Sequence, residues 1–248
     1  MKVSILQHDI MWGEPAKNRL RLTEQITAQS GVDLYVLTEM WSTGFATEPV
    51  GLAERDNVSL EWMKQMAQQQ NAAIAGSIAV EEDGRFYNRL YFVKPDGSVA
   101  YYDKRHLFAY GGEDRYYSRG IKRVVVEWRG VRFLLTVCYD LRFPIGMRNH
   151  NDYDALICVA NWPTQRIEAW NTLLRARAIE NQCYAIGVNR VGRDSVCEYC
   201  GESAVIHPYG HAIAACERNK EGYAEAILDM QALEDFRKKF PVLSETDI

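Results

Sequence analysis

One cysteine stands where a protein would present a nucleophile. Cys138 ends an apolar run that begins at Val131, and a polar segment containing Asp140 and Pro144 follows it directly. A buried strand fixes a sulfur atom in place, and a sharp turn after the strand exposes the thiol beside free backbone N–H groups. Free cysteines are often inert core residues, so nucleophilic chemistry at Cys138 requires a base and a cation elsewhere in the chain.

Three charged residues occupy comparable positions, at the ends of apolar runs or in the loops just beyond them. Glu39 follows the run 34–38, Lys104 follows the run 99–102, and Glu113 comes shortly afterwards. In open α/β sheets, sites form beyond the carboxyl ends of the strands, so these groups can converge. Taken singly, each would be read as a solvated surface charge.

Together with Cys138, these residues form a chemically complete set for attack on an amide-like carbon. Glu39 can accept the proton of the thiol, and Lys104 with the backbone N–H of Tyr139 can hold the developing oxyanion. A cation near the sulfur also favours the thiolate. The sequence therefore predicts acyl chemistry at Cys138.

The elements that must position these residues are short strands with helices between several of them. Strand-like runs cover 3–6, 34–37, 72–78, 89–93, 99–102, 124–127, 132–137, 155–159, 183–188, 203–206, 212–216 and 224–228. Apolar residues at helical spacing predict helices around 22–26, 60–67 and 165–182. Hairpin signals stand at Asp96-Gly97 and at Pro208-Tyr209-Gly210. This alternation predicts an α/β protein with mixed sheets.

The composition of the chain limits its class and its partners. Of 248 residues, 47% are hydrophobic and 25% are charged, and no linker divides them, which predicts a single domain over 1–248. The net charge of -4 indicates no nucleic-acid partner, and no apolar stretch approaches the roughly 20 residues that span a bilayer, which predicts no membrane partner. Polar residues come too early for a signal peptide, so we expect a cytoplasmic protein whose six cysteines are reduced thiols.

Cys197 and Cys200 form a C-x-x-C pattern, which His207 and His211 follow. The distance from Cys200 to His207 is well short of the ~12 residues of a zinc finger, and the turn at 208–210 separates the two histidines onto different strands. A structural zinc ion needs four converging ligands. The sequence therefore predicts no metal site.

In their order and context, Glu39, Lys104 and Cys138 resemble the Glu–Lys–Cys triad of the nitrilase superfamily, the carbon–nitrogen hydrolases. The supporting segments are 37–41, 103–108 and 137–144, together with Gln7, 12–18 and Asn88. Within the superfamily the chain looks closest to the bacterial ω-amidases, for which 159–163, 176–182 and 187–192 are typical.

The resemblance implies an αββα four-layer sandwich with two mixed sheets, no metal or organic cofactor, and a homodimer or higher homo-oligomer. It implies hydrolysis of the terminal amide of a small 2-oxo acid, such as 2-oxoglutaramate or 2-oxosuccinamate, to ammonia and the 2-oxo dicarboxylate. Glu39 would be the general base and Cys138 the nucleophile. Lys104 and the Tyr139 N–H would hold the oxyanion, and Glu113 would position Lys104 or the substrate.

The substrate carboxylate needs a cation, and bidentate arginine suits it. The candidates are Arg142, Arg115 and Arg166, with structural ion pairing as the alternative. Aromatic residues that could wall a small pocket are Trp41, Phe45 and Trp162, with core packing as the alternative.

Two other functions stay open at this point. One is a carbon–nitrogen hydrolase of different specificity, for an N-carbamoyl compound or a deaminated-peptide amide; a nitrile substrate fits the ω-amidase segments less well. The other is a catalytically silent protein of this fold that only binds a ligand. The intact set of Glu39, Lys104 and Cys138 argues against the silent protein, because binding alone does not need it.

Overall fold

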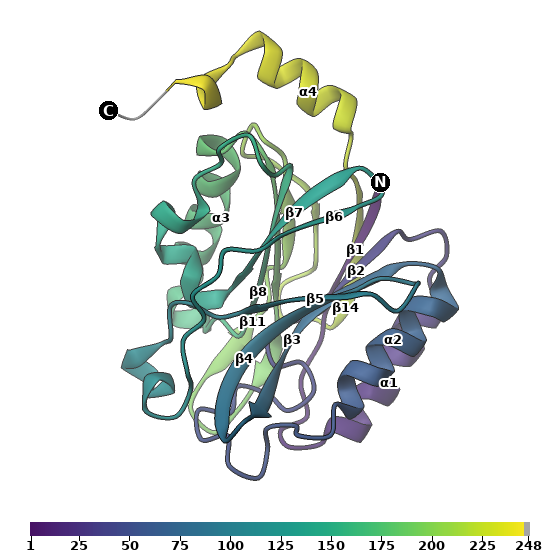
Figure 1. The fold of residues 1–248 in the computed structure, drawn as a ribbon, viewed down its shortest axis with the longest axis vertical. Coiled ribbons are helices and arrows are strands. Elements are labelled where there is room, and N and C mark those ends of the chain that lie inside the picture. The colour runs from purple at the N-terminus through teal and green to yellow at the C-terminus, as the bar shows by residue number, and fades with distance from the viewer. Residues whose placement is uncertain (246–248) are drawn as a thin grey trace.

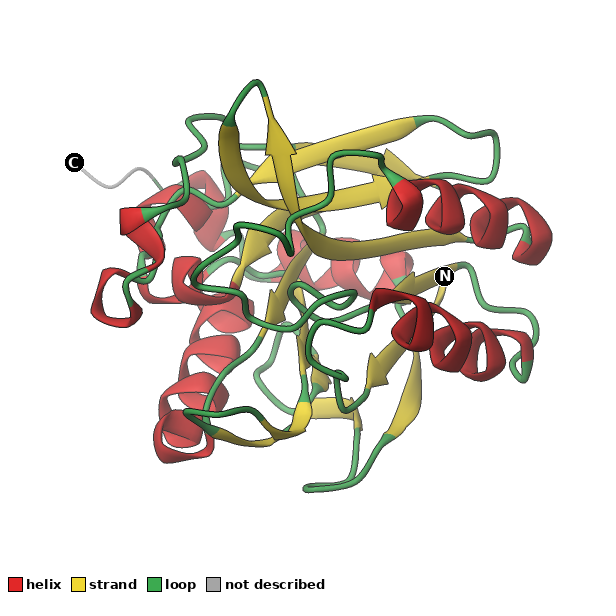
Figure 2. Cartoon of the chain, turned by 90° about the horizontal axis from the view of Figure 1, so that it is seen from below, coloured by secondary structure: helices red, strands yellow, loops and turns green. Residues whose placement is uncertain are grey.

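Two six-stranded mixed sheets pack against each other in the computed structural model, which describes residues 1–245. The helices α1 (Pro15–Thr27) and α2 (Val58–Gln70) lie together on the outer side of one sheet, and α3 (Ile167–Glu180) lies on the outer side of the other (Figures 1 and 2). The predicted αββα sandwich with two mixed sheets is therefore confirmed. Among residues 1–245, no helix is both long and apolar enough to cross a bilayer.

The first sheet is built from the N-terminal half of the chain and one late strand. Its strands, in spatial order, are β14 (Gly222–Ile227), β1 (Lys2–Gln7), β2 (Leu34–Val36), β3 (Ala73–Glu82), β4 (Arg85–Val93) and β5 (Val99–Asp103). β1, β2 and β3 are parallel. β14 pairs antiparallel with β1, β4 pairs antiparallel with β3, and β5 pairs antiparallel with β4.

The second sheet repeats this plan. Its strands, in spatial order, are β13 (Ala212–Ala215), β12 (Ala204–Ile206), β9 (Tyr184–Asn189), β8 (Ala155–Ala160), β7 (Val131–Val137) and β6 (Val125–Trp128). β7, β8 and β9 are parallel. A separate two-stranded ribbon consists of β10 (Val191–Arg193) and β11 (Glu198–Cys200).

The core lies between the sheets, and its residues explain why the central strands could be read from the sequence. The rings of Phe92 in β4 and Phe133 in β7 meet there with centroids 5.7 Å apart. Parallel strands are covered on both faces, so they appear as continuous apolar runs. In β8, every side chain is buried. Burial of Leu156, Ile157 and Val159 in this strand contributes about 1.5–3 kcal/mol each.

Three elements were not anticipated. The ribbon of β10 and β11 is short, and α4 (Met230–Lys239) buries Leu233 but little else. Local signals start and end α4: the Asp229 carboxylate accepts a hydrogen bond from the Ala232 N–H at 3.0 Å, and three basic residues occupy its last turn. Apolar residues do recur at helical spacing in α4, at Met230, Leu233 and Phe236, so the same pattern that predicts the other three helices also indicates this one.

The sheets place the carboxyl ends of β2 and of β7 and β8 near one another. Glu39 follows β2, Cys138 follows β7, and Asn161 follows β8. Because β8 is parallel to β7, both of these strands end at the same edge of the second sheet.

Candidate active site

Cys138 is the first residue of a short 3₁₀ turn, Cys138–Arg142, directly after β7. Its φ is 47°, in the left-handed region that residues other than glycine rarely adopt. Such a conformation costs of order 1–3 kcal/mol and persists only where the surroundings impose it. The side chain is 9% exposed and lines a cavity of about 620 Å³. The strand end and turn predicted from the sequence are thus present, and the thiol reaches a cavity.

Lys104, Glu39 and Glu113 form one buried ionic cluster. The Lys104 Nζ donates to Glu39 Oε1 at 2.9 Å and to Glu113 Oε1 and Oε2 at 3.1 and 2.9 Å. All three side chains are fully shielded from solvent. A buried ammonium is tolerated only where carboxylates compensate its charge, so each of these residues requires the others.

Two asparagines that the sequence did not single out as site residues complete the cluster. Asn88 Nδ2 bridges the two carboxylates, at 2.8 Å from Glu39 Oε1 and 3.1 Å from Glu113 Oε1. The Asn161 N–H donates to Glu39 Oε2 at 2.8 Å, and Asn161 Nδ2 donates to the Glu39 carbonyl at 2.8 Å. Hydrogen bonds therefore hold both carboxylate oxygens of Glu39 in fixed positions. Asn161 stands just beyond a strand end, which is the signal that identified Glu39.

The charges of this cluster act on the Cys138 thiol. Burial raises the pKa of Cys138 well above its usual value, and the Glu39 charge adds to this effect while Lys104 opposes it. Cys138 therefore holds its proton at neutral pH, and attack by the sulfur requires a base.

The same surroundings shift the pKa values of Lys104 and Glu113. Burial disfavours the Lys104 ammonium, but the Glu113 and Glu39 carboxylates outweigh burial and hold the Lys104 pKa well above its ordinary value. Burial also raises the pKa of Glu113, with Lys104 opposing the rise. The cluster thus keeps a permanent cation beside the thiol.

Four of the five residues predicted to bind substrate line the cavity that Cys138 reaches. They are Phe45, Tyr139, Arg142 and Trp162. The Lys104 Nζ lies 5.4 Å from the centre of the Phe45 ring, so this wall borders the ionic cluster. Tyr139 packs edge-on against Phe108, with ring centroids 5.2 Å apart. These contacts place aromatic surface around the thiol.

Trp41 lies elsewhere. It is fully buried, and its ring centroid is 4.8 Å from that of Trp62 on α2. A Cβ on Gly76 of β3 would come within 2.8 Å of the Trp41 ring, so the indole fills the space that this glycine leaves open. Met40, with a φ of 43°, turns the chain between Glu39 and Trp41. Trp41 is therefore a core residue, not the pocket wall that the sequence suggested.

Of the three arginine candidates, Arg142 and Arg166 line the cavity and Arg115 does not. The Arg142 guanidinium carbon lies 5.0 Å from the Trp162 ring centre, and that of Arg166 lies 5.3 Å from the Phe108 ring centre. Within residues 1–245, neither guanidinium forms a salt bridge with a carboxylate. Arg115 is exposed in the loop that carries Glu113. Two cations thus face the cavity without an acidic partner in the described part of the chain.

The C-x-x-C segment divides between two environments. Cys197 lines the cavity, whereas Cys200 is buried in β11. The His207 and His211 rings stack on each other with centroids 4.6 Å apart, across the turn between β12 and β13. In the described residues, no three His, Cys, Asp or Glu side chains converge as metal ligands would.

Comparison with known proteins gives a consistent result. The family model of carbon-nitrogen hydrolases matches residues 2–238. The chain is 44% identical to the omega-amidase YafV of Escherichia coli, over 100% of this chain and 97% of that protein. It is 36% identical to the 2-oxoglutaramate amidase of Bacillus subtilis, over 98% of this chain and 96% of that protein.

A solved structure extends the similarity to three dimensions. XC1258 from Xanthomonas campestris is a CN-hydrolase superfamily protein with an arsenic adduct in its active site. Its structure matches this one with a TM-score of 0.97 at 39% identity, over 100% of this chain and 97% of that chain.

Proposed function

This chain belongs to the carbon–nitrogen hydrolase family and hydrolyses carbon–nitrogen bonds other than peptide bonds; from that premise we propose that it cleaves the terminal amide of a small 2-oxo acid. The substrates would be 2-oxoglutaramate or 2-oxosuccinamate, and the products ammonia and the 2-oxo dicarboxylate. The observation that carries the proposal is the buried Lys104 cluster, whose charges act on the Cys138 thiol. This thiol lines a cavity that Arg142 and Arg166 also line, and within residues 1–245 neither arginine forms a salt bridge.

In the first half of the reaction, Glu39 takes the proton of the Cys138 thiol and the sulfur attacks the amide carbon. The carbonyl electron pair moves to oxygen, where the Lys104 ammonium and the Tyr139 N–H hold the negative charge. Tyr139 is in the first turn of a 3₁₀ segment, where N–H groups lack intrahelical partners. Protonated Glu39 then gives its proton to the nitrogen, the carbon–nitrogen bond breaks and ammonia leaves.

In the second half, water replaces ammonia. Glu39 takes a proton from the water, whose oxygen attacks the thioester carbon, and the same donors hold the second oxyanion. The carbon–sulfur bond breaks, the acid is released, and the proton on Glu39 returns to the sulfur. One base serves both halves because each leaving group restores it. Glu113, which shares the Lys104 ammonium with Glu39, holds that cation in place.

The test of this function is an ammonia-release screen. It would compare 2-oxoglutaramate and 2-oxosuccinamate with glutamine, asparagine and N-carbamoyl compounds, each at several concentrations. We expect the 2-oxo acid amides to have the highest kcat/KM. Turnover of N-carbamoyl compounds alone would contradict the proposal and favour the alternative specificity.

Arg142→Gln tests how the substrate carboxylate is bound. A hydrogen bond to a charged group contributes about 1.5–3 kcal/mol, so we expect KM for 2-oxoglutaramate to rise about 10–100-fold with a smaller change in kcat. Arg115→Gln is the matched control, because Arg115 is exposed and does not line the cavity. Equal KM values for the two variants would exclude Arg142 as the carboxylate-binding residue, and Arg166 would be substituted next.

Three further properties of the enzyme are its domain organisation, its location and its oligomeric state. We propose a single domain over 1–248, a cytoplasmic location, and a homodimer or higher homo-oligomer. Exposed apolar side chains that lie close together support self-association: the ring of Tyr209, 60% exposed, packs on Phe236 of α4, and the neighbouring Gly210 lies against Ile179 of α3, 53% exposed.

A further inference from the structure

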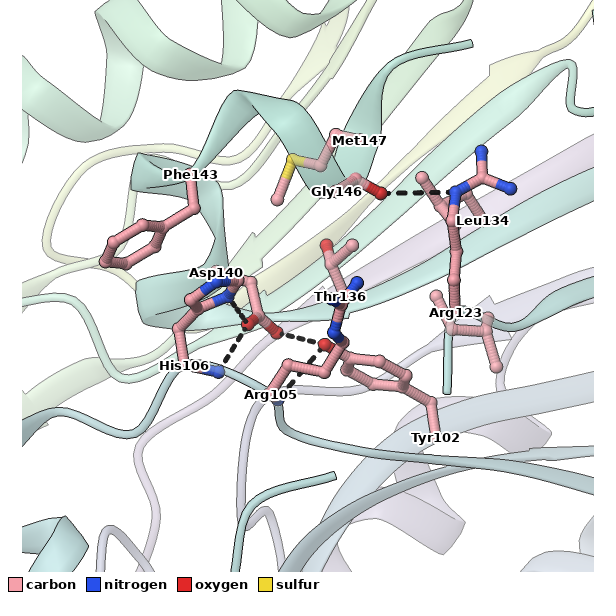
Figure 3. A pocket seen from close by; sticks show the side chains of 11 residues that line it. Tyr102, Arg105, His106, Arg123, Leu134, Thr136, Asp140, Phe143, Gly146 and Met147 are labelled. Carbon is pink, nitrogen blue, oxygen red and sulfur yellow. Dashed lines mark hydrogen bonds and ion pairs between the residues drawn. The ribbon is translucent and has the colours of Figure 1, made fainter. Parts of the chain in front are cut away.

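Asp140 belongs to the 3₁₀ turn that begins at Cys138, and its carboxylate makes four hydrogen bonds, of which those with Tyr102 and His106 are drawn in Figure 3. Its Oδ2 accepts from the Val137 N–H at 2.9 Å and from the Tyr102 hydroxyl at 2.8 Å. Its Oδ1 accepts from the His106 N–H at 3.0 Å and lies 2.8 Å from His106 Nδ1. An ionised carboxylate only accepts, so His106 Nδ1 carries a proton. Asp140 is 2% exposed, so its carboxylate depends on these protein donors.

These donors come from the two segments that hold the reacting groups. Val137 directly precedes Cys138 in the chain, and Tyr102 and His106 stand on either side of Lys104. The Tyr102 hydroxyl also accepts from the Arg105 N–H at 3.2 Å. One carboxylate therefore connects the segment of the nucleophile to the segment of the cation.

Little space remains for these segments to shift. The ring of His106 stacks on that of Phe143 at 4.0 Å with 6° between the planes. The pocket beside them in Figure 3, between Tyr102, Asp140 and Met147, holds about 10 Å³, which is at most the room of one water molecule. Solvent cannot readily replace the donors that meet at Asp140.

We propose that Asp140 is a positioning residue, whose carboxylate holds the Cys138 turn and the Lys104 segment in one fixed arrangement. The sulfur and the ammonium then face the same substrate carbonyl group. Asp140 does not line the cavity, so it acts through these neighbours and not on the substrate. The inference rests on the roles proposed above for Cys138 and Lys104.

Asp140→Asn is the first test. The new amide has the size of the carboxylate, but in either orientation its NH₂ group faces a backbone N–H, of Val137 or of His106, that can only donate, and the two segments must move apart to relieve the conflict. A displacement of about 1 Å can cost 10²-fold in rate, so we expect kcat for 2-oxoglutaramate to fall about 100-fold while KM changes far less. Tyr102→Phe removes one of the four donors, and we expect an intermediate fall in kcat.

Asp154→Asn is the matched control. Asp154 is also a buried carboxylate with several donors, from Arg132 and Arg237, but it stands at the opposite end of β8 from Asn161. We expect its substitution to lower Tm at least as much as Asp140→Asn does, with kcat close to that of the wild type. Falls in kcat that simply follow Tm across both variants would reduce Asp140 to a structural role and overturn the proposal.

A second readout does not depend on the substrate. The Lys104 charge lowers the pKa of Cys138, so separating the two should move the pH profile of Cys138 alkylation by iodoacetamide to higher pH. Looser packing alone would speed alkylation at every pH without shifting the profile. Should no 2-oxo acid amide be a substrate, the proposed function fails while this profile still tests Asp140. An unshifted profile in both Asp140→Asn and Tyr102→Phe would overturn the proposal, and Tyr102→Phe decides alone if Asp140→Asn does not fold.

Discussion

Cys138→Ala is expected to lower kcat for ammonia release from 2-oxoglutaramate by at least about 10⁴-fold while the chain stays folded. The sulfur is the atom that attacks the amide carbon, and no other group of the Lys104 cluster is a comparable nucleophile. Alanine adopts the φ of 47° no less easily than cysteine does, so the substitution adds no backbone strain. Ammonia release and circular dichroism spectra of the two proteins provide the comparison.

The chain offers a matched control for this variant. Cys197 lines the same cavity as Cys138, but none of the charges of the Lys104 cluster is among the groups that act on its thiol. Cys197→Ala should therefore retain nearly all of the wild-type kcat. Loss of activity in Cys197→Ala, with activity kept in Cys138→Ala, would show that Cys197 and not Cys138 is the nucleophile.

Glu39→Gln is expected to lower kcat by about 10³-fold, within the range for loss of a general acid–base group. Burial is the main cause of the raised pKa of Cys138 and persists when the Glu39 charge is removed, so without Glu39 the sulfur must lose its proton to solvent. The thiolate fraction grows as pH rises towards that pKa, and the residual rate of Glu39→Gln should therefore increase with pH throughout the alkaline range. Measurement of kcat/KM from neutral to alkaline pH checks both the magnitude and the slope.

Comparison with Glu113→Gln shows whether Glu39 acts as a general base or only through its negative charge. Both substitutions remove one carboxylate from Lys104, and both leave the other carboxylate in place. Only Glu39 is proposed to accept the thiol proton. The kcat of Glu113→Gln should therefore fall about 10–100-fold, and its kcat/KM should keep the wild-type dependence on pH. Equal losses and equal slopes in the two variants would mean that Glu39 acts through charge alone.

The convergence of the reactive residues could be predicted because parallel strands show it in the sequence. Cys138 and Glu39 both follow buried apolar runs, β7 in one sheet and β2 in the other, and sites form beyond the carboxyl ends of such strands. Asn161 follows β8 in the same way and binds Glu39 through its backbone N–H. It could have been found by the same reasoning, whereas Asn88 lies inside β4 and carries no comparable signal.

Side-chain direction within loops could not be predicted. Trp41 is two residues from Glu39, yet the turn at Met40 sends it into the core against Trp62. Nor does closeness in sequence distinguish Arg142, which lines the cavity, from Arg115, which does not. Such outcomes depend on individual φ values and on tertiary packing, and a single sequence does not encode them in any periodic pattern.

The hydrogen bonds to Asp140 could not be predicted from the sequence either. Its donors are far apart in the chain, at positions 102, 106 and 137, and only the packed sheets bring them onto one carboxylate. Asp140 follows Cys138 so closely that the sequence presents it as part of a polar turn. The structure instead connects it to both sides of the proposed site.

In the proposed reaction the acyl group passes through the sulfur of Cys138. Acid quenching during turnover of 2-oxoglutaramate, followed by peptide mass spectrometry, tests it directly. We expect the peptide containing Cys138 to gain the mass of the substrate acyl group and to lose it once substrate is exhausted. Cys138→Ala should never show this mass. Steady ammonia release by an enzyme whose Cys138 peptide stays unmodified, matched by undiminished release from Cys138→Ala, would contradict it.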